Sequence, residues 1–390
     1  MSEANLATIA KIAEVTLGTT PGSPELTTIT FSGETLKNSI ETVVSQAIRS
    51  DRQIDDLVKV GSSPDGGYDF ELNYGDYDEE LRGALGAAAW NNHSQALGDV
   101  AFDSSAQTLV NTGGEYSDVV AGALLTIANA EDSGNNGDKR VVSVSSDGNT
   151  VTFAAGSIIS TNANDTTADT AQVAIVNGIL KPGMTIEKGV TNTAGTKFFQ
   201  IYTGMVVDTL SLNIESRAIL TGSVGFIGMG RALGTATIDT SGTYTAPISN
   251  PVMNGTSNIG SITVDGVTAT EKFKSLSIDI TNNLRGKDAM GTEGNFDIGT
   301  GTFNLTGTLS AYFLNNDFLT RIDANTSFAL ELTVTDNDSD AYNFFLPNCK
   351  PVNGDPAITA INTDVMIDTE YQAIRSAVYD ITFAITKLPA

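Results

Sequence analysis

Cysteine, histidine and tryptophan each occur only once in this chain of 390 residues. The one cysteine, Cys349, cannot form a disulfide within the chain, and a Cys/His zinc site needs about four ligands. Catalysis of the Ser–His–Asp or Cys–His type would have to use His93, and no nucleophile-elbow motif accompanies it. These scarcities exclude an intrachain disulfide framework and a Cys/His zinc centre, and they disfavour histidine-dependent catalysis.

Basic residues are also scarce, because 21 Lys and Arg stand against 46 Asp and Glu, which gives a net charge of -25. A protein that grips nucleic acid needs clustered Lys and Arg to neutralise phosphates. The balance therefore argues against such a protein. It suits either general solubility or a surface that repels DNA.

Long apolar runs are missing, since no stretch approaches the roughly 20 residues needed to span a bilayer. Residues 1–10 carry Glu3 and no basic segment of the kind that begins a secretory signal. We therefore expect a protein that is made and folded in a cytoplasm.

Hydrophobic residues make up 40% of the chain, and 38 glycines accompany many Thr, Ser and Asn residues. This composition predicts a mainly β protein with real cores and many turns. Tyr68, Phe70 and Leu72 alternate with polar residues, which is typical of a half-buried strand. A helix is predicted directly after it, over 78–89, and a second short helix near 315–323.

Composition also divides the chain. Residues 100–195 are nearly free of aromatic residues, and short β-like runs such as 119–127 and 150–154 predict a small all-β insertion. The predicted organisation is a flexible or docking arm (1–27), a first domain copy in two parts (28–99 and 196–232) around the insertion (100–195), a linker (233–261) and a second copy (262–390).

The two copies are predicted from a diverged internal repeat. Ile48-Arg49-Ser50-Asp51-Arg52 precedes a Gly-rich turn and an alternating strand, and so does Leu284-Arg285-Gly286-Lys287-Asp288. The interval from Phe70 to Tyr77 equals that from Leu305 to Tyr312, and a predicted short helix follows each tyrosine. Further matches pair 197–199 with 343–345, 207–209 with 367–369, and 217–226 with 375–383, where an Arg precedes a closing strand in both. The closing strand of the second copy is predicted over 377–386.

Motifs that could carry chemistry are weak throughout. The run 336–340 begins like a calcium loop, but Ala341 and Pro347 stand where an EF-hand needs Gly and Glu, so a hairpin tip is predicted. The glycines of 225–230 lack dinucleotide-loop spacing and favour close strand packing. The many carboxylates of 51–80 predict a solvated face. His93 is predicted to be solvated or capping, and Cys349 to be a small residue in a turn or strand end. We expect no catalytic, cofactor-binding or metal-binding residues.

Two segments nevertheless resemble a known family. Ser32-Gly-Glu-Thr-Leu36, Ile48-Arg-Ser-Asp-Arg-Gln53 and Gly67-Tyr-Asp-Phe-Glu-Leu72 are similar to the major tail tube proteins of siphophages, which are bacteriophages with long flexible tails. Leu276-Ser-Ile-Asp-Ile280 and Gly301-Thr-Phe-Asn-Leu-Thr-Gly307 resemble the same family. The motifs cover about half of the chain, 28–90 and 270–390, and 100–195 and 231–262 match nothing known.

The resemblance implies a structural, non-enzymatic virion protein made in the host bacterial cytoplasm. Its fold would be a duplicated β-sandwich or partial barrel with a short flanking helix in each copy. Copies of the chain would form rings, and the rings would stack into a hollow tail tube that conducts DNA into the host without specific binding. The tape measure protein and the tail terminator and tip proteins are the further partners implied, with no membrane.

Two finer expectations concern assembly. The equivalent loops carrying Ile48, Arg49, Asp51 and Arg52, and Leu284, Arg285, Lys287 and Asp288, are predicted to contact other subunits, because charged residues before a Gly-rich turn do not suit a core. A ring of three duplicated chains is favoured over a ring of six in which one copy decorates the outside. The rival hypothesis from another class is an Ig-like cell-surface or adhesin-type β protein, which would have a similar composition.

Overall fold

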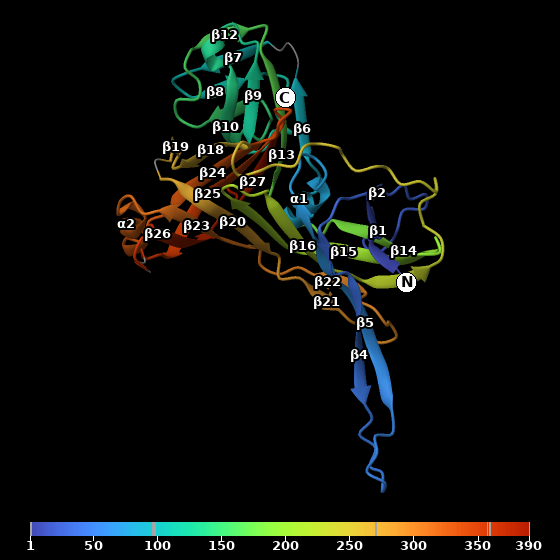
Figure 1. Ribbon diagram of the computed structural model, residues 1–390. Helices are drawn as coiled ribbons and strands as arrows, with labels where there is room; N and C mark the ends of the chain where they lie inside the picture. The colour runs from blue at the N-terminus through green and yellow to red at the C-terminus, as the bar shows by residue number, and fades with distance from the viewer. Residues whose placement is uncertain (1, 96–98, 270, 357, 359, 390) are drawn as a thin grey trace.

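The computed structural model describes residues 2–95, 99–269, 271–356, 358 and 360–389. It is dominated by antiparallel strands, with two short α-helices, which confirms the mainly β fold class. Figure 1 shows a central sheet, a small β module above it and a long hairpin that extends below it.

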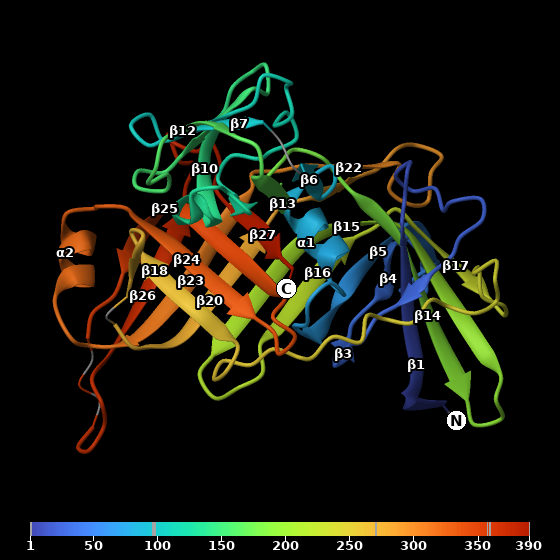
Figure 2. The ribbon, with the colours of Figure 1, turned by 90° about the horizontal axis from the view of Figure 1, so that it is seen from above.

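Eight strands lie side by side in the central sheet. The first half of the chain supplies β4 (Lys37–Val44), β5 (Leu57–Glu71), β16 (Thr221–Ile227) and the C-terminal part of β15 (Lys197–Glu215), and the short β3 (Gly33–Glu34) continues the line of β4 along β5. The second half supplies β20 (Phe273–Thr281), β23 (Asn304–Tyr312), β26 (Met366–Ala373) and the C-terminal part of β25 (Ala341–Asn353). Because β15 pairs with β20, the two halves form one sheet (Figure 2).

The long strands β15 and β25 change neighbours along their length. The N-terminal part of β15 pairs with β14 (Gly183–Asn192) and β17 (Gly230–Gly234), and β14 pairs with β1 (Ser2–Ala13), which pairs with β2 (Thr27–Thr28). The N-terminal part of β25 pairs with β24 (Phe328–Thr335) and β27 (Ala384–Leu388), and β24 pairs with β18 (Ile259–Val264), which pairs with β19 (Val267–Thr268). The two halves therefore share one order of strands.

Each half also carries its short helix directly after the second central strand. Helix α1 (Asp78–Leu85) follows β5, and α2 (Asp317–Asp323) follows β23, as the sequence predicted. Helix α1 ends earlier than the predicted 89, because Gly86 adopts a left-handed conformation with a φ of 61°. This conformation suits glycine, and the amide of Gly86 caps the carbonyls of the last turn.

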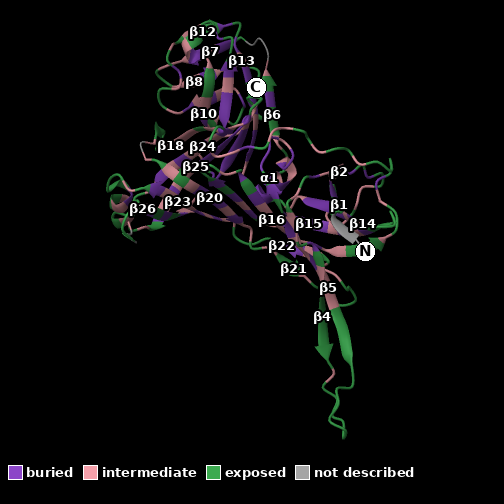
Figure 3. Cartoon of the chain, in the orientation of Figure 1, coloured by how far each residue is buried: buried purple, intermediate pink, exposed green. Residues whose placement is uncertain are grey.

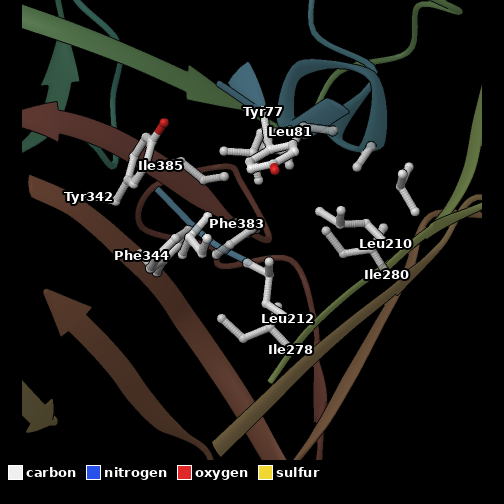
Figure 4. Close-up of a cluster of buried hydrophobic side chains, with 14 of the residues drawn as sticks. Tyr77, Leu81, Leu210, Leu212, Ile278, Ile280, Tyr342, Phe344, Phe383 and Ile385 are labelled. Carbon is white, nitrogen blue, oxygen red and sulfur yellow. The ribbon is translucent and has the colours of Figure 1, made fainter. Parts of the chain in front are cut away.

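The main core lies between the central sheet, helix α1 and the strands that cover them. Leu210, Leu212, Ile278 and Ile280 point from β15 and β20 toward a layer of aromatic and aliphatic side chains (Figure 4). That layer contains Tyr77 and Leu81 near α1, and Tyr342, Phe344, Phe383 and Ile385 in the second half. Burying one such side chain contributes about 1.5–3 kcal/mol, so this layer is the main stabilising feature of the fold.

The predicted insertion forms a small module with a core of its own. Its strands are β6 (Asn91–Gln95), β7 (Val100–Asp103), β8 (Thr108–Val110), β9 (Leu124–Ala128), β10 (Gly137–Val144), β11 (Thr150–Phe153), β12 (Asn162–Asp165) and β13 (Asp169–Val176), with a 3-10 turn at Ser133–Asn135. Phe102, Leu109, Tyr116, Val141 and Phe153 are buried inside it (Figure 3). Strand β13 leaves the module and pairs with β27, so the insertion is seated on the second half of the chain.

The structure adds detail to three expectations about the chain's organisation. Of the two alternatives for residues 1–27, a flexible or a docking arm, the described part is docked, because β1 lies in the sheet and Ile9 is buried. The insertion ends before 195, since β14 belongs to the main sheet between β1 and β15. The predicted linker 233–261 is anchored to the first half, because Met253 is fully buried and its amide donates to the carbonyl of Leu72.

Some predicted strands are also shorter in the structure. The strand predicted over 119–127 begins only at Leu124, as β9, and the strand predicted over 377–386 begins only at Ala384, as β27. The pairing order also changes the proposed match of 207–209 with 367–369. Val207 lies in β15 but Ile367 lies in β26, whose place in the sheet corresponds to that of β16.

Candidate assembly surfaces

The central sheet has one open face that is polar over its whole width. Alternate residues of β5, β16, β15, β20, β23 and β26 point away from the core and are exposed or half-buried. Most of these side chains are Ser, Thr and Asn. The acidic side chains of this open face are Asp69, Glu71, Glu215, Asp279, Asp368 and Glu370.

Within the paired stretches of these six strands no basic residue accompanies the carboxylates, and Lys37 of β4 and Lys350 of β25 lie at the two edges of the sheet. The paired stretches 65–71, 209–215, 221–227, 275–281, 304–312 and 366–373 contain neither Lys nor Arg. Two of the carboxylates come from the first copy's β5 and two from the second copy's β26, so both halves of the chain contribute. Over these six strands the open face is therefore acidic and hydroxyl-rich, and its field repels phosphate groups.

The two edges of this sheet are unpaired in the chain along part of their length. One edge is formed by β4 and β3, which pair with β5 on their inner side. The opposite edge is the end of β25, where Lys350–Asn353 pair with β26 on one side, and the pairing with β24 has ended at Cys349. Exposed strand edges are templates for pairing with another chain.

The connection between β4 and β5 is a long hairpin that projects far from the body (Figure 1). Its shaft exposes several apolar side chains, namely Ile40, Val43, Val44, Leu57, Val58 and Val60. At its tip Ile48 is fully exposed, and the Arg49 guanidinium pairs with the carboxylates of Asp51 at 2.8 Å and Asp55 at 2.5 Å. The predicted contact residues Ile48, Arg49, Asp51 and Arg52 thus lie together at the exposed tip.

The second predicted loop, which connects β20 to β23, is folded differently. It contains a small hairpin of β21 (Arg285–Lys287) and β22 (Asp297–Gly299), in which Asp297 accepts from Lys287 at 2.6 Å and from Lys181 at 2.7 Å. These two ammonium groups hold the pKa of the Asp297 carboxyl well below its usual range. The carbonyl of Glu293 accepts from the amide of Ser62 at 2.8 Å, so this loop lies against the base of the long hairpin.

Leu284 and Lys287 are half-buried, whereas Arg285 and Asp288 are exposed. The structure therefore does not bring the two predicted groups together. The first group is at the far end of a hairpin, and the second is beside the base of that hairpin in the same chain.

The single histidine and cysteine have structural surroundings. His93 lies in β6 and is buried, contrary to the expectation of a solvated residue, and its ring bonds Asp118 at 2.8 Å and Thr170 at 3.0 Å. Cys349 is fully buried within β25, and burial raises the pKa of its thiol. A buried protonated thiol is a poor nucleophile. Among the described residues, no group of three or more His, Cys, Asp or Glu could hold a metal ion, and 336–340 forms the hairpin between β24 and β25.

The acidic block 51–80 is not a uniform solvated face, as the sequence had suggested. Glu80 is fully buried and accepts from Lys11 of β1 at 2.6 Å and from the Tyr68 hydroxyl. Asp78 is bonded to Lys387 of β27 at 2.5 Å and to the Tyr342 hydroxyl at 2.6 Å. Burial raises the pKa of the Asp78 carboxyl, against the opposing effect of the Lys387 ammonium. These carboxylates fasten α1 to strands from both ends of the chain.

Comparison with known protein families decides what kind of protein carries these surfaces. The model of the phage tail tube protein family matches residues 4–373. The chain belongs to the phage tail tube protein family. It is therefore a structural component of the phage tail and part of the virion, with no enzymatic role. Membership also implies that the tail tube protein assembles with copies of itself into a tube.

No curated protein matches this tail tube protein. Among the residues that the structure describes, no helix has the length and apolar character needed to cross a membrane. The sequence did not identify the individual residues of the open acidic face. A signal was present in β20, where the polar Ser275, Ser277 and Asp279 alternate with the apolar Leu276 and Ile278. What the sequence did not show is that six such strands lie on one surface.

Proposed function

We propose that this tail tube protein forms rings in which the open acidic face lines the lumen, and that the stacked rings conduct DNA through the tail of a siphophage. The observation that carries the proposal is the open face itself, whose six inner strands, from both halves, bear six carboxylates and no Lys or Arg in their paired stretches. A lumen of this kind does not hold the passing phosphates, because like charges repel and the inner strands carry no cluster of Lys or Arg to bind them.

Three chains complete such a ring. Each half of the chain supplies four strands to the central sheet in the same order, and β15 pairs with β20 without a break in the open face. Both halves are therefore suited to form the wall of the tube. This favours a ring of three duplicated chains over a ring of six chains in which one half of each chain lies outside the wall. Symmetry analysis of tube images, or the mass of a dissociated ring, tests this: six chains per ring would contradict it.

The long hairpin provides contact between rings. A two-stranded hairpin is marginally stable alone in water, and a projecting apolar surface marks an interaction site. Its shaft exposes Ile40, Val43 and Leu57, and its tip exposes Ile48. A neighbouring subunit that covers these side chains supplies the missing burial. At the two ends of the tube, tail terminator and tip proteins take the place of the next ring, and the tape measure protein lies inside during assembly.

Charge reversal on the open face tests the lumen assignment. Asp69→Lys with Asp368→Lys changes one exposed carboxylate in each half, while Asp338→Lys, on the hairpin between β24 and β25, is the matched control with the same kind of change elsewhere. Phage complemented with the double variant should form particles of normal number whose infectivity per particle falls at least tenfold. Particles from the control should infect normally. Full infectivity of the double variant would refute the lumen assignment.

A further inference from the structure

The pairing between the two halves of one chain predicts how one chain pairs with the next. The two strands that end the sheet occupy the same positions in their halves as the two strands that pair at the internal junction. Inside the chain the last central strand of the first half, β15, pairs with the first central strand of the second half, β20. The last central strand of the second half is β25, and the first central strand of the first half is β4 with β3. In the second half, β25 therefore occupies the position that β15 has in the first half. In the first half, β4 with β3 occupies the position that β20 has in the second half.

The register follows from irregularities that both halves share. Strand β15 has a pairing shift against β16 between Val207 and Thr209, and β25 has the same shift against β26 between Pro351 and Asn353. Asp208 therefore corresponds to Val352, and Thr209 corresponds to Asn353.

The opposite edge is aligned in the same way. Phe226 of β16 pairs with Gly66, and Tyr371 of β26 pairs with Gly307, so Gly66 corresponds to Gly307. Three positions before Gly66, Ser63 pairs with Ser39, and three before Gly307, Asn304 pairs with Thr281. Ser39 therefore corresponds to Thr281, and Lys37 to Asp279.

We propose that Lys37–Ile40 of one copy pair antiparallel with Val352–Asp355 of a second copy, in the register of β15 and β20. This rests on the proposed self-assembly and names the seam that closes the ring. Thr209 pairs with Thr281, which places Ser39 opposite Asn353. Ser211 pairs with Asp279, which places Lys37 opposite Asp355. The amide of Asn282 donates to the carbonyl of Asp208 at 2.8 Å, which places Ile40 against Val352.

The side chains at these positions suit one another, although the alignment used only backbone pairing. Lys37 and Asp355 have opposite charges and both are exposed. Ile40 and Val352 are apolar, with exposed fractions of 55% and 60% in the single chain. Directly opposed pairs of these two kinds stabilise antiparallel sheets. The seam thus covers apolar surface and brings a second carboxylate to Lys37, whose ammonium lies 3.8 Å from Asp65 within the chain.

The structure also shows a difference that the seam explains. Residues 209–220 and 353–365, which lead to β16 and β26, are nearly equal in length. Strand β15 continues to Glu215 where it pairs with β20, whereas β25 ends at Asn353. Both strands pair on one side, with β16 and with β26; the first half finds a second hydrogen-bonding neighbour in β20, and among the described residues the second half has none on that side.

Paired cysteines test the seam in the full-length chain. Ser39→Cys with Asn353→Cys should give interchain disulfides under mild oxidation, seen as multimers on a non-reducing gel. The two positions lie seven strands apart in one sheet, roughly 30 Å, so a disulfide within one chain cannot form. Thr42→Cys with Asn353→Cys is the out-of-register control, displaced by about 10 Å along the strand. The native Cys349 is buried and serves as background in every sample.

A charge exchange gives a second readout. Lys37→Glu alone and Asp355→Lys alone should each lower the fraction of protein in rings at least tenfold by sedimentation, and the double exchange should restore it. If wild-type tubes form but the in-register cysteines cross-link no better than the control pair, the seam is wrong and the tube function stands. If the wild-type protein forms no rings and the in-register cysteine variant forms no cross-links, the seam and the proposed function both fail.

Discussion

Replacing Lys11 by methionine tests whether the N-terminal segment is part of the fold. The Lys11 ammonium lies 2.6 Å from both carboxylate oxygens of Glu80 and 3.0 Å from the carbonyl of Asp76, and Glu80 is fully buried. Methionine keeps the aliphatic stem but leaves the carboxylate without its cation. Breaking a buried ion pair from one side costs about 3–5 kcal/mol, because a charge stays buried and uncompensated.

The expected loss in melting temperature follows from the size of the chain. At about 2.1 cal/mol/K of unfolding entropy per residue, a chain of this length loses roughly 4–6 °C for that cost. Thermal unfolding followed by circular dichroism at low protein concentration measures it. Lys11→Met with Glu80→Gln should regain at least half of the loss, because the buried charge is gone. Lys197→Met is the control, since Lys197 is exposed at the start of β15.

Two outcomes would refute this reasoning. A melting temperature for Lys11→Met within about 1 °C of the wild type would show that β1 is not coupled to α1 through this pair. Equal instability of the single and double variants would show that packing, not the unpaired carboxylate, carries the effect.

The remaining predictions concern the insertion and the hairpin tip. Replacing 100–168 by a short Gly/Ser joint should leave a soluble protein that assembles, because that segment has its own core; replacing 100–195 should abolish folding, because it removes β14 from between β1 and β15. Solubility and electron microscopy decide both, and equal behaviour of the two deletions would contradict the assigned boundary. Arg49→Glu should leave rings intact but shorten or prevent tubes, since it breaks two ion pairs at the tip, and tubes of normal length would remove the tip from the contact between rings.

Local patterns in the sequence were enough to predict several elements. The alternation around Phe70 predicted β5, and acidic residues before an apolar stripe predicted the start of α1 at Asp78. The shortage of Lys and Arg predicted an acidic protein, and the change of composition near residue 100 predicted the insertion. All of these are properties of neighbouring residues, which is why a linear reading finds them.

Other features depend on which distant strands become neighbours, and the tertiary structure decided them. Residues 1–27 looked like an arm because their polarity says nothing of Lys11 meeting Glu80, 69 positions away. The acidic block looked like one solvated surface, but Glu80 points into the core while Asp69 points to the open face. A period of two fixes that a strand has two faces, and only the packing of other elements decides which face is covered. The sequence alone thus determined strands, helices and charge, whereas the shared order of the two halves and the unpaired edges came from long-range pairing.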